Sequence, residues 1–140
     1  MKATIRSAFD QEMSLAKDAY NRRQLDDSFK LLERAHILGQ RYFIAHLITH
    51  WWMLKVGIRK MDWREIRGQV LRLIAVIPAY LLGWVPRGNT GGANVSALKP
   101  MPIPDDLAAL LKGNNVWVDM FMRVISWSFI GTIACIGVLK

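Results

Sequence analysis

The sequence holds a single cysteine, Cys135, among its 140 residues. One thiol excludes an internal disulfide and every zinc motif that depends on paired cysteines. Acidic residues are also scarce, at eleven Asp and Glu against nineteen Lys and Arg, and there are only three histidines. A metal site or an acid-base site in this chain must therefore use very few side chains.

The chain also lacks the marks of several protein classes. No continuous apolar run precedes the first acidic residues, which predicts the absence of a secretory signal peptide. No helix-turn-helix, RNA-binding or zinc-finger pattern accompanies the net charge of +8, so nucleic acid is not an expected partner. A hydrophobic content of 52% with 21% charged residues favours a protein that is associated with a membrane or partly inserted into it, and not one mostly embedded in lipid.

Apolar periodicity predicts an all-α protein, a small bundle of four to five helices. The expected helices cover residues 7–23, 26–38 and 41–56, followed by a fourth that begins at Asp62 and a short fifth after residue 105. We expect a helical domain over residues 1–112 and a hydrophobic tail over residues 113–140. The tail is long enough for a C-terminal helix that anchors in a membrane, or that docks on the bundle or on a partner chain.

The first two expected helices form a hairpin that resembles a single tetratricopeptide repeat. The resemblance rests on aromatic, small and apolar residues at the positions of that repeat, namely Tyr20, Leu25, Ser28, Leu32 and Ala35. A peptide-binding array needs about three or more stacked repeats. The resemblance therefore implies a scaffold geometry and no peptide receptor.

Residues 86–105 are rich in glycine and proline. A phosphate-binding loop is not indicated, because no strand-like run precedes the glycines and no Lys-Ser or Lys-Thr pair follows them at the required spacing. We expect an ordered loop of tight turns that packs back over the bundle. The sequence leaves open whether this loop reaches the histidines, and an approach of Asn89 or Asn94 to His36 would favour a composite ligand site.

Three bases in the middle of the chain, Lys60, Arg64 and Arg67, lie at helical spacing. A basic stripe on one helix face suits anionic lipid headgroups, and the alternative is a solvated helix face. The stripe and the tail together predict that the protein contacts a membrane. The alternative partner is another protein.

All three histidines fall within residues 33–53. Glu33 and His36 are three residues apart, and His46 and His50 are four apart, so each pair shares a helix face. A turn at residues 39–40 would bring the two pairs together, and imidazole with carboxylate suits zinc, copper, iron or nickel. We therefore predict that Glu33, His36, His46 and His50 bind a transition metal; the alternative is a set of buried histidines with a purely structural role.

Three stretches of the chain resemble an uncharacterised bacterial family with a domain of unknown function. Its motifs ERAHxxxQ, HxxxHWxML and VPxGNTGGANVSAxKPMPIPxDLA occur here at residues 33–40, 46–54 and 85–108. The resemblance covers residues 31 to about 111 and stops before the tail. It implies membership of the family but supplies no established activity.

The leading hypothesis is a metal-binding accessory protein that buffers, delivers or senses a transition metal at the cytoplasmic face of a bacterial inner membrane, or in the cytoplasm if the tail docks on protein. The alternative is a non-catalytic interaction subunit of a membrane-associated complex, in which the histidines are structural. A metal-dependent enzyme is less favoured, because no second group of acid, base or nucleophile accompanies the histidines.

Overall fold

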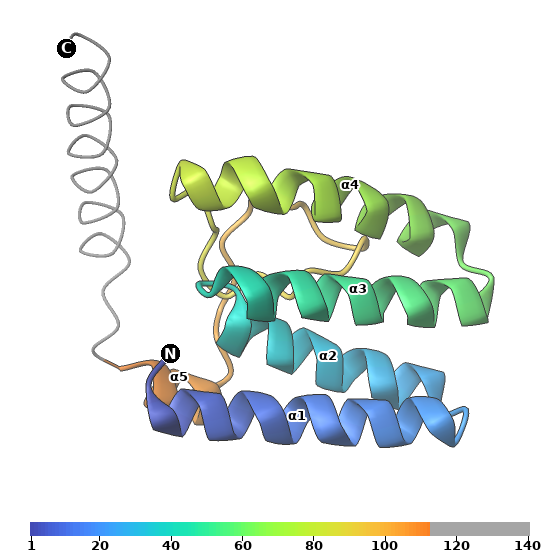
Figure 1. The fold of residues 1–140 in the computed structure, drawn as a ribbon, viewed down its shortest axis with the longest axis horizontal. Coiled ribbons are helices and arrows are strands. Elements are labelled where there is room, and N and C mark those ends of the chain that lie inside the picture. Colours follow the sequence, from blue (N-terminus) through green and yellow to red (C-terminus); the bar gives the residue numbers. More distant parts are fainter. Residues whose placement is uncertain (113–140) are drawn as a thin grey trace, which may run out of the picture.

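The computed structural model describes residues 1–112, which form five α-helices and no β-strand. In chain order the helices are α1 (Ala3–Asn21), α2 (Leu25–Gly39), α3 (Phe43–Lys60), α4 (Trp63–Leu81) and α5 (Asp105–Leu111). Helices α1 to α4 stack in chain order, and α5 lies beside the N-terminal end of α1 (Figure 1). The prediction of a small all-α bundle is confirmed for these residues. Among them, no helix combines the length and the apolar character needed to cross a membrane.

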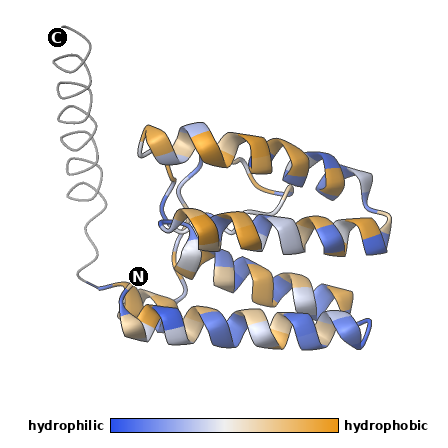
Figure 2. Ribbon diagram, in the orientation of Figure 1, coloured by the Kyte–Doolittle hydropathy of each residue, from blue (hydrophilic) through white to orange (hydrophobic). Residues whose placement is uncertain are grey.

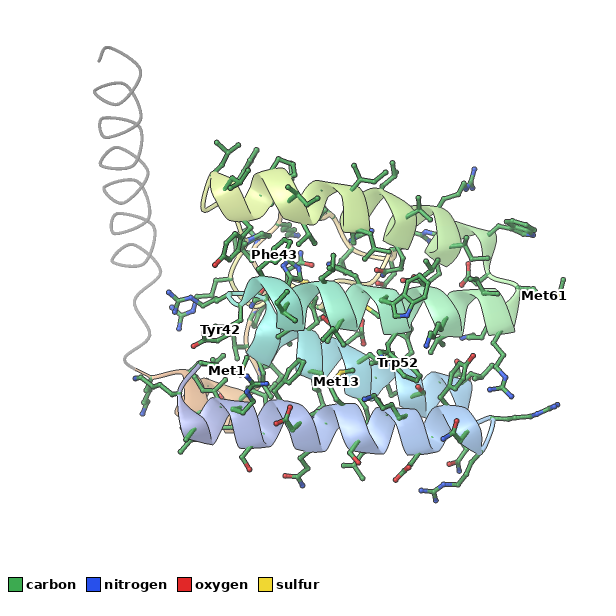
Figure 3. All side chains as sticks on the ribbon, in the orientation of Figure 1. Met1, Met13, Tyr42, Phe43, Trp52 and Met61 are labelled. Carbon is green, nitrogen blue, oxygen red and sulfur yellow. The ribbon has the colours of Figure 1, made fainter. Side chains whose placement is uncertain are left out.

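Helices α1 and α2 enclose an apolar core. Helix α1 presents a buried residue at every third or fourth position, which is the spacing of one helix face: Ile5, Phe9, Met13 and Ala16. Met13 lies between α1 and α2 (Figure 3). Helix α2 contributes three fully buried apolar side chains, Leu32, Ala35 and Leu38. Helix α5 adds the buried side chains of Leu107 and Leu111.

Arg34 ties three helices together on the surface of this core. Its Nε atom donates to Glu12 of α1 over 2.7 Å, and its Nη2 atom donates to Asp106 of α5. The two carboxylates raise the pKa of the Arg34 guanidinium, Asp106 more than Glu12. The short helix α5 is thereby joined to the hairpin although about seventy residues separate it from α2 in the chain.

Helix α3 lies between α2 and α4 (Figure 1). At its start the ring of Phe43 meets the ring of Tyr80 from the far end of α4, with centroids 5.1 Å apart (Figure 3). At its end Met61 adopts a left-handed conformation, with φ 57°, and Asp62 then caps α4 by accepting a hydrogen bond from the backbone N–H of Glu65 over 3.0 Å. A short αL turn therefore makes α3 and α4 antiparallel neighbours.

The expectation that the third helix ends at residue 56 is wrong. Gly57 stays within α3, which continues to Lys60, because α4 packs closely there: an added Cβ on Gly57 would lie 3.2 Å from Cγ of Glu65. Lys60 therefore belongs to α3, where it pairs with Asp26, whereas Arg64 and Arg67 belong to α4. The three bases do not form one stripe along a single helix.

The predictions for residues 113–140, a hydrophobic helix that anchors in a membrane or docks on protein, lie outside the described residues. The tetratricopeptide-like character of the first hairpin also stays a prediction. The hairpin itself is present as α1 and α2, which break at residues 22–24 as expected.

Candidate metal centre

Three histidines converge between α2, α3 and the loop that follows α4. His36 lies in the last turn of α2, and His46 and His50 lie one turn apart on α3. The Nε2 atom of His50 is 3.0 Å from Nε2 of His46 and 3.3 Å from Nε2 of His36. None of the three residues is more than 7% exposed, and each offers a nitrogen within 4.8 Å of the other two. The spacing seen in the sequence thus becomes a buried cluster of three imidazoles.

The opposite edges of two of these rings are held by hydrogen bonds. Nδ1 of His36 lies 2.8 Å from the backbone carbonyl oxygen of Asn89. Nδ1 of His50 lies 2.7 Å from Oε1 of Gln69. A carbonyl oxygen only accepts, so Nδ1 of His36 must carry the proton and donate it. In the neutral ring, Nε2 of His36 then has a free lone pair that points into the cluster.

The same reasoning applies to His50, because the amide of Gln69 has a fixed orientation. Its Nε2 atom donates to the carbonyl of Gly91 over 2.8 Å and to the carboxylate of Glu65. Both of these partners are acceptors, so the other end of the amide must be the oxygen that faces His50. His50 therefore donates from Nδ1 and also turns an unprotonated Nε2 toward the cluster.

Helix α4 holds the loop by a row of polar side chains. The carboxylate of Glu65 accepts from the backbone N–H of Ala93 over 3.0 Å. About two turns further along α4, Arg72 donates to the backbone carbonyls of Gly92 and Val95 over 2.9 and 2.7 Å. Glu65 thus caps the loop instead of completing a reciprocal capping box with Asp62. These hydrogen bonds from α4 hold the loop next to the histidines.

The loop is also braced internally by Asn89. Its side-chain amide donates to the carbonyls of Ser96 and Lys99, each over 2.8 Å, while its Oδ1 accepts from the N–H of Gly91 over 2.9 Å. Asn89 is only 3% exposed, and its own backbone carbonyl receives the proton of His36. The expected ordered loop is therefore present, and it reaches the histidine cluster through Asn89.

Gly91 allows the loop to lie flat on the ring of His36. Its φ of +82° falls in the region that glycine adopts freely, and an added Cβ would lie 2.8 Å from Cδ2 of His36. Any side chain here would both strain the backbone and push the ring. The glycine-rich sequence thus serves close packing against an imidazole rather than the binding of phosphate.

Burial makes all three imidazoles hard to protonate. It lowers the pKa of His46 to about 3 and that of His50 to about 4, and it lowers the pKa of His36 well below the usual range. Repulsion between the rings adds to the effect on His36 and His46, and Arg72 adds to the effect on His50. At neutral pH the cluster therefore presents neutral imidazoles, which is the form that binds metals.

Glu33, the fourth residue predicted for the site, is not part of this cluster. The group of side chains whose ligand atoms converge holds only the three histidines. Glu33 faces the loop instead, where an added Cβ on Gly92 would lie 3.3 Å from its Oε1 atom. Burial raises its pKa, against the opposing influence of Thr90. The loop lies between α2 and α4 at this level, because Gly92 is next to Glu33 and Ala93 donates to Glu65.

A cavity of about 270 Å³ adjoins the histidines. All three rings line it, together with Arg72. The rest of the wall comes mainly from apolar side chains of α4 and of the loop, among them Ala75, Val76, Ala79, Leu82, Val85 and Pro86. No Asp, Glu or Cys of the described residues lines it. The cluster is therefore buried on one side and borders an apolar chamber on the other.

The polar residues of α4 that support the cluster were not predicted from the sequence. Glu65, Gln69 and Arg72 lie at spacings of four and three, so they share one face of a helix whose other positions are largely apolar. Gln69 has no exposed surface at all. A polar stripe at helical spacing inside an apolar helix was the available signal, because such a stripe must find polar partners when the helix is buried.

The fold and the cluster together define a class: a small all-α protein with three buried imidazoles that could hold a metal ion. The family described as "Protein of unknown function (DUF3703)" matches residues 3–111, and the chain belongs to this family. The match includes α1 and the first part of α2, which the motifs at residues 33–108 did not cover. No curated protein and no solved structure matches the chain.

Proposed function

We propose that this protein binds a transition metal ion through His36, His46 and His50 and acts as a metal-binding accessory protein, in buffering, delivery or sensing. The observation that carries the proposal is the convergence of three Nε2 atoms from rings of which two donate from Nδ1 to fixed acceptors. A protein that holds imidazoles by their outer edges in this way sets the tautomer that a metal requires.

The distances support a shared cation. Two unprotonated nitrogens 3.3 Å apart, on His36 and His50, direct lone pairs at each other, which is unfavourable without a proton or a metal between them. Burial opposes a charged imidazolium, as the lowered pKa values of all three rings indicate, so with three neutral rings the proton available inside the cluster is an Nε2–H of His46, 3.0 Å from Nε2 of His50. Nitrogens about 2.0–2.1 Å from a tetrahedral zinc ion lie roughly 3.3 Å apart. A bound metal would relieve the repulsion between His36 and His50 at about the present separation of their Nε2 atoms.

The donor set favours borderline metals. Neutral imidazole suits zinc, copper, iron and nickel, and the absence of thiolate and carboxylate from the cluster of described residues argues against a site selected for soft or hard ions. Behind His50, the chain from Gln69 to Glu65 places a carboxylate two hydrogen bonds from the ring. Such carboxylates increase the basicity of a histidine ligand and orient it.

The proposal is tested by elemental analysis of the untagged protein, purified without chelator. We expect near-stoichiometric metal in the wild type and none in a His46→Ala, His50→Ala double variant. Thr49→Val is the matched control, because Thr49 is fully buried on the same helix and its hydroxyl bonds only to the helix carbonyls of Ala45 and His46. Equal metal content in the double variant and the control would sink the proposal.

A second candidate function, that of an interaction subunit in a membrane-associated complex, is favoured by a different observation. The C-terminal half of α4 is largely apolar, as Figure 2 shows. From its middle to the residue that follows it, the helix exposes several large side chains: Leu71, Ile74, Ile77, Leu81 and Leu82. Exposed apolar surface of this kind often marks a contact site. If the double variant keeps the metal content of the wild type, this candidate moves ahead of the first.

A further inference from the structure

We propose that the cavity beside the three histidines binds a small anion with an apolar body, and that the anionic group of this molecule occupies the open coordination position of the metal. The inference rests on the proposed function, because it assigns the fourth ligand of the proposed metal. It goes further in naming a class of small molecule that the site would recognise.

The first step is the open position. Structural zinc sites are closed by four protein ligands, whereas sites that react or exchange ligands keep three and leave one position free. The cluster of described residues supplies three imidazoles and no fourth donor. All three rings line the same cavity, so the free position of a metal held by them faces that chamber.

The second step is the size and nature of the chamber. An apolar cavity of about 150 Å³ can hold benzene, and the chamber here has a volume of about 270 Å³. It therefore has room for one ring with a short substituent. Its walls include Ala75, Val76 and Ala79 of α4 and Leu82, which directly follows α4. Such walls favour an apolar body over a strongly hydrated one.

The third step is charge. Three neutral imidazoles add no negative charge to a metal ion, and the half-buried guanidinium of Arg72 lies in the same wall. Glu65, the carboxylate that acts on Arg72, lies behind Gln69 and outside the chamber. No carboxylate of the described residues lines the chamber to balance them. An anionic donor, such as a carboxylate, would neutralise this charge at a partly buried site, where water screens charges less than at the surface. The recognised molecule should thus combine a monoanionic donor with a small apolar group.

The test uses the full chain loaded with cobalt(II), whose visible absorption reports its ligands. We expect titration with benzoate to change the absorption bands and to saturate. Acetate carries the same donor without the apolar ring and should bind about tenfold to hundredfold more weakly, the loss expected for one phenyl group. Benzyl alcohol carries the ring without the anion and should leave the bands unchanged.

A pair of α4 variants locates the binding site. Ala79→Phe fills the chamber from its wall and should keep cobalt(II) but lose the preference for benzoate over acetate. Ile77→Phe, two residues away on the exposed side and 54% exposed in the wild type, should behave as the wild type. Should Ala79→Phe fail to fold, the comparison of benzoate with acetate on the wild type decides alone.

The outcomes separate this inference from the proposed function. Failure to bind cobalt(II) overturns both. Binding of cobalt(II) with equal affinities for benzoate and acetate, or with no response to either, overturns the inference and leaves the metal site standing. A benzoate response that Ala79→Phe retains in full would also overturn it, because the anion would then bind outside the chamber.

Discussion

Helix α2 takes part in two cores that differ in chemistry. Toward α1 it buries Leu32 and Leu38 in a core of mainly aliphatic and aromatic side chains, which also takes in Met53 and Val56 of α3. Toward α3 and the loop it buries His36, in a core that also holds Gln69 and Asn89. The first core is non-directional and stabilises by the area that it removes from water. The second depends on paired donors and acceptors, each of which must have its partner.

The comparison indicates that the apolar core stabilises the fold and that the histidine core serves another purpose. An apolar core of this kind needs no titratable group, whereas the histidine core brings three bases together at a cost in solvation. Such an arrangement adds little stability by itself and is most easily explained by a ligand that it binds. The two cores should therefore respond differently to acid, to truncation of apolar side chains and to loss of a polar partner.

The largest expected difference is in the response to pH of the metal-free protein. An unfolded histidine has a pKa of about 6.5, whereas folding lowers the pKa of His50 to about 4 and that of His46 to about 3. Below pH 6.5 the unfolded chain therefore binds protons that the folded chain does not. The free energy of unfolding should fall with falling pH, by about 1.4 kcal/mol per pH unit for each histidine, until the folded pKa values are passed. Urea unfolding in chelator at pH 7, 6 and 5 measures this slope.

The His46→Ala, His50→Ala variant is the control, because only His36 then contributes. Its slope between pH 6 and pH 5 should be smaller than that of the wild type by up to about 2.7 kcal/mol per pH unit. Parallel slopes would mean that the rings are protonated inside the folded protein, and the contrast between the two cores would be lost.

The next largest effect is expected in the apolar core. Leu32→Ala removes a side chain with no exposed surface and should lower the free energy of unfolding by about 2–5 kcal/mol. The metal affinity of the folded protein should stay within about twofold, because the side chain belongs to the other core. Denaturant unfolding with and without metal measures both quantities.

Leu15→Ala is the matched control on α1, where the side chain is 45% exposed, and it should change stability by no more than about 0.5 kcal/mol. A loss of metal affinity in Leu32→Ala by tenfold or more would show that the cores are coupled through α2 and do not act separately.

The sequence predicted the apolar core well because that core follows local periodicity. The buried positions of α1 recur at steps of three and four, and the break at residues 22–24 that follows it could also be predicted. The spacing of His46 and His50 is also local, so their shared face could be predicted. His36 joined them because a hairpin brings sequence neighbours together.

The remaining features depend on contacts between distant parts of the chain. Asn89 meets His36 across 53 residues, and nothing local in the sequence specifies this pairing. Glu33 faces the same loop and not the cluster, which the count of residues around a hairpin could not show. Gly57 was expected to end a helix, but it serves the close approach of α4. Glycines and polar residues serve several structural purposes, and only the packed structure distinguishes among them.

The smallest expected effect sharpens the comparison at a single hydrogen bond. Gln69→Leu fills a similar volume but removes the acceptor for Nδ1 of His50 and the donor to Gly91. Loss of such a partner behind a ligand typically lowers metal affinity about tenfold to hundredfold. Competition with a chromophoric chelator measures the affinity.

Gln40→Leu is the control, since Gln40 is 3% exposed and its amide donates to the carbonyl of Ile37. If both variants weakened metal binding equally, the effect would come from general disturbance of the polar core. An effect confined to Gln69→Leu would show that the tautomer of His50, held from α4, is what prepares the cluster for metal.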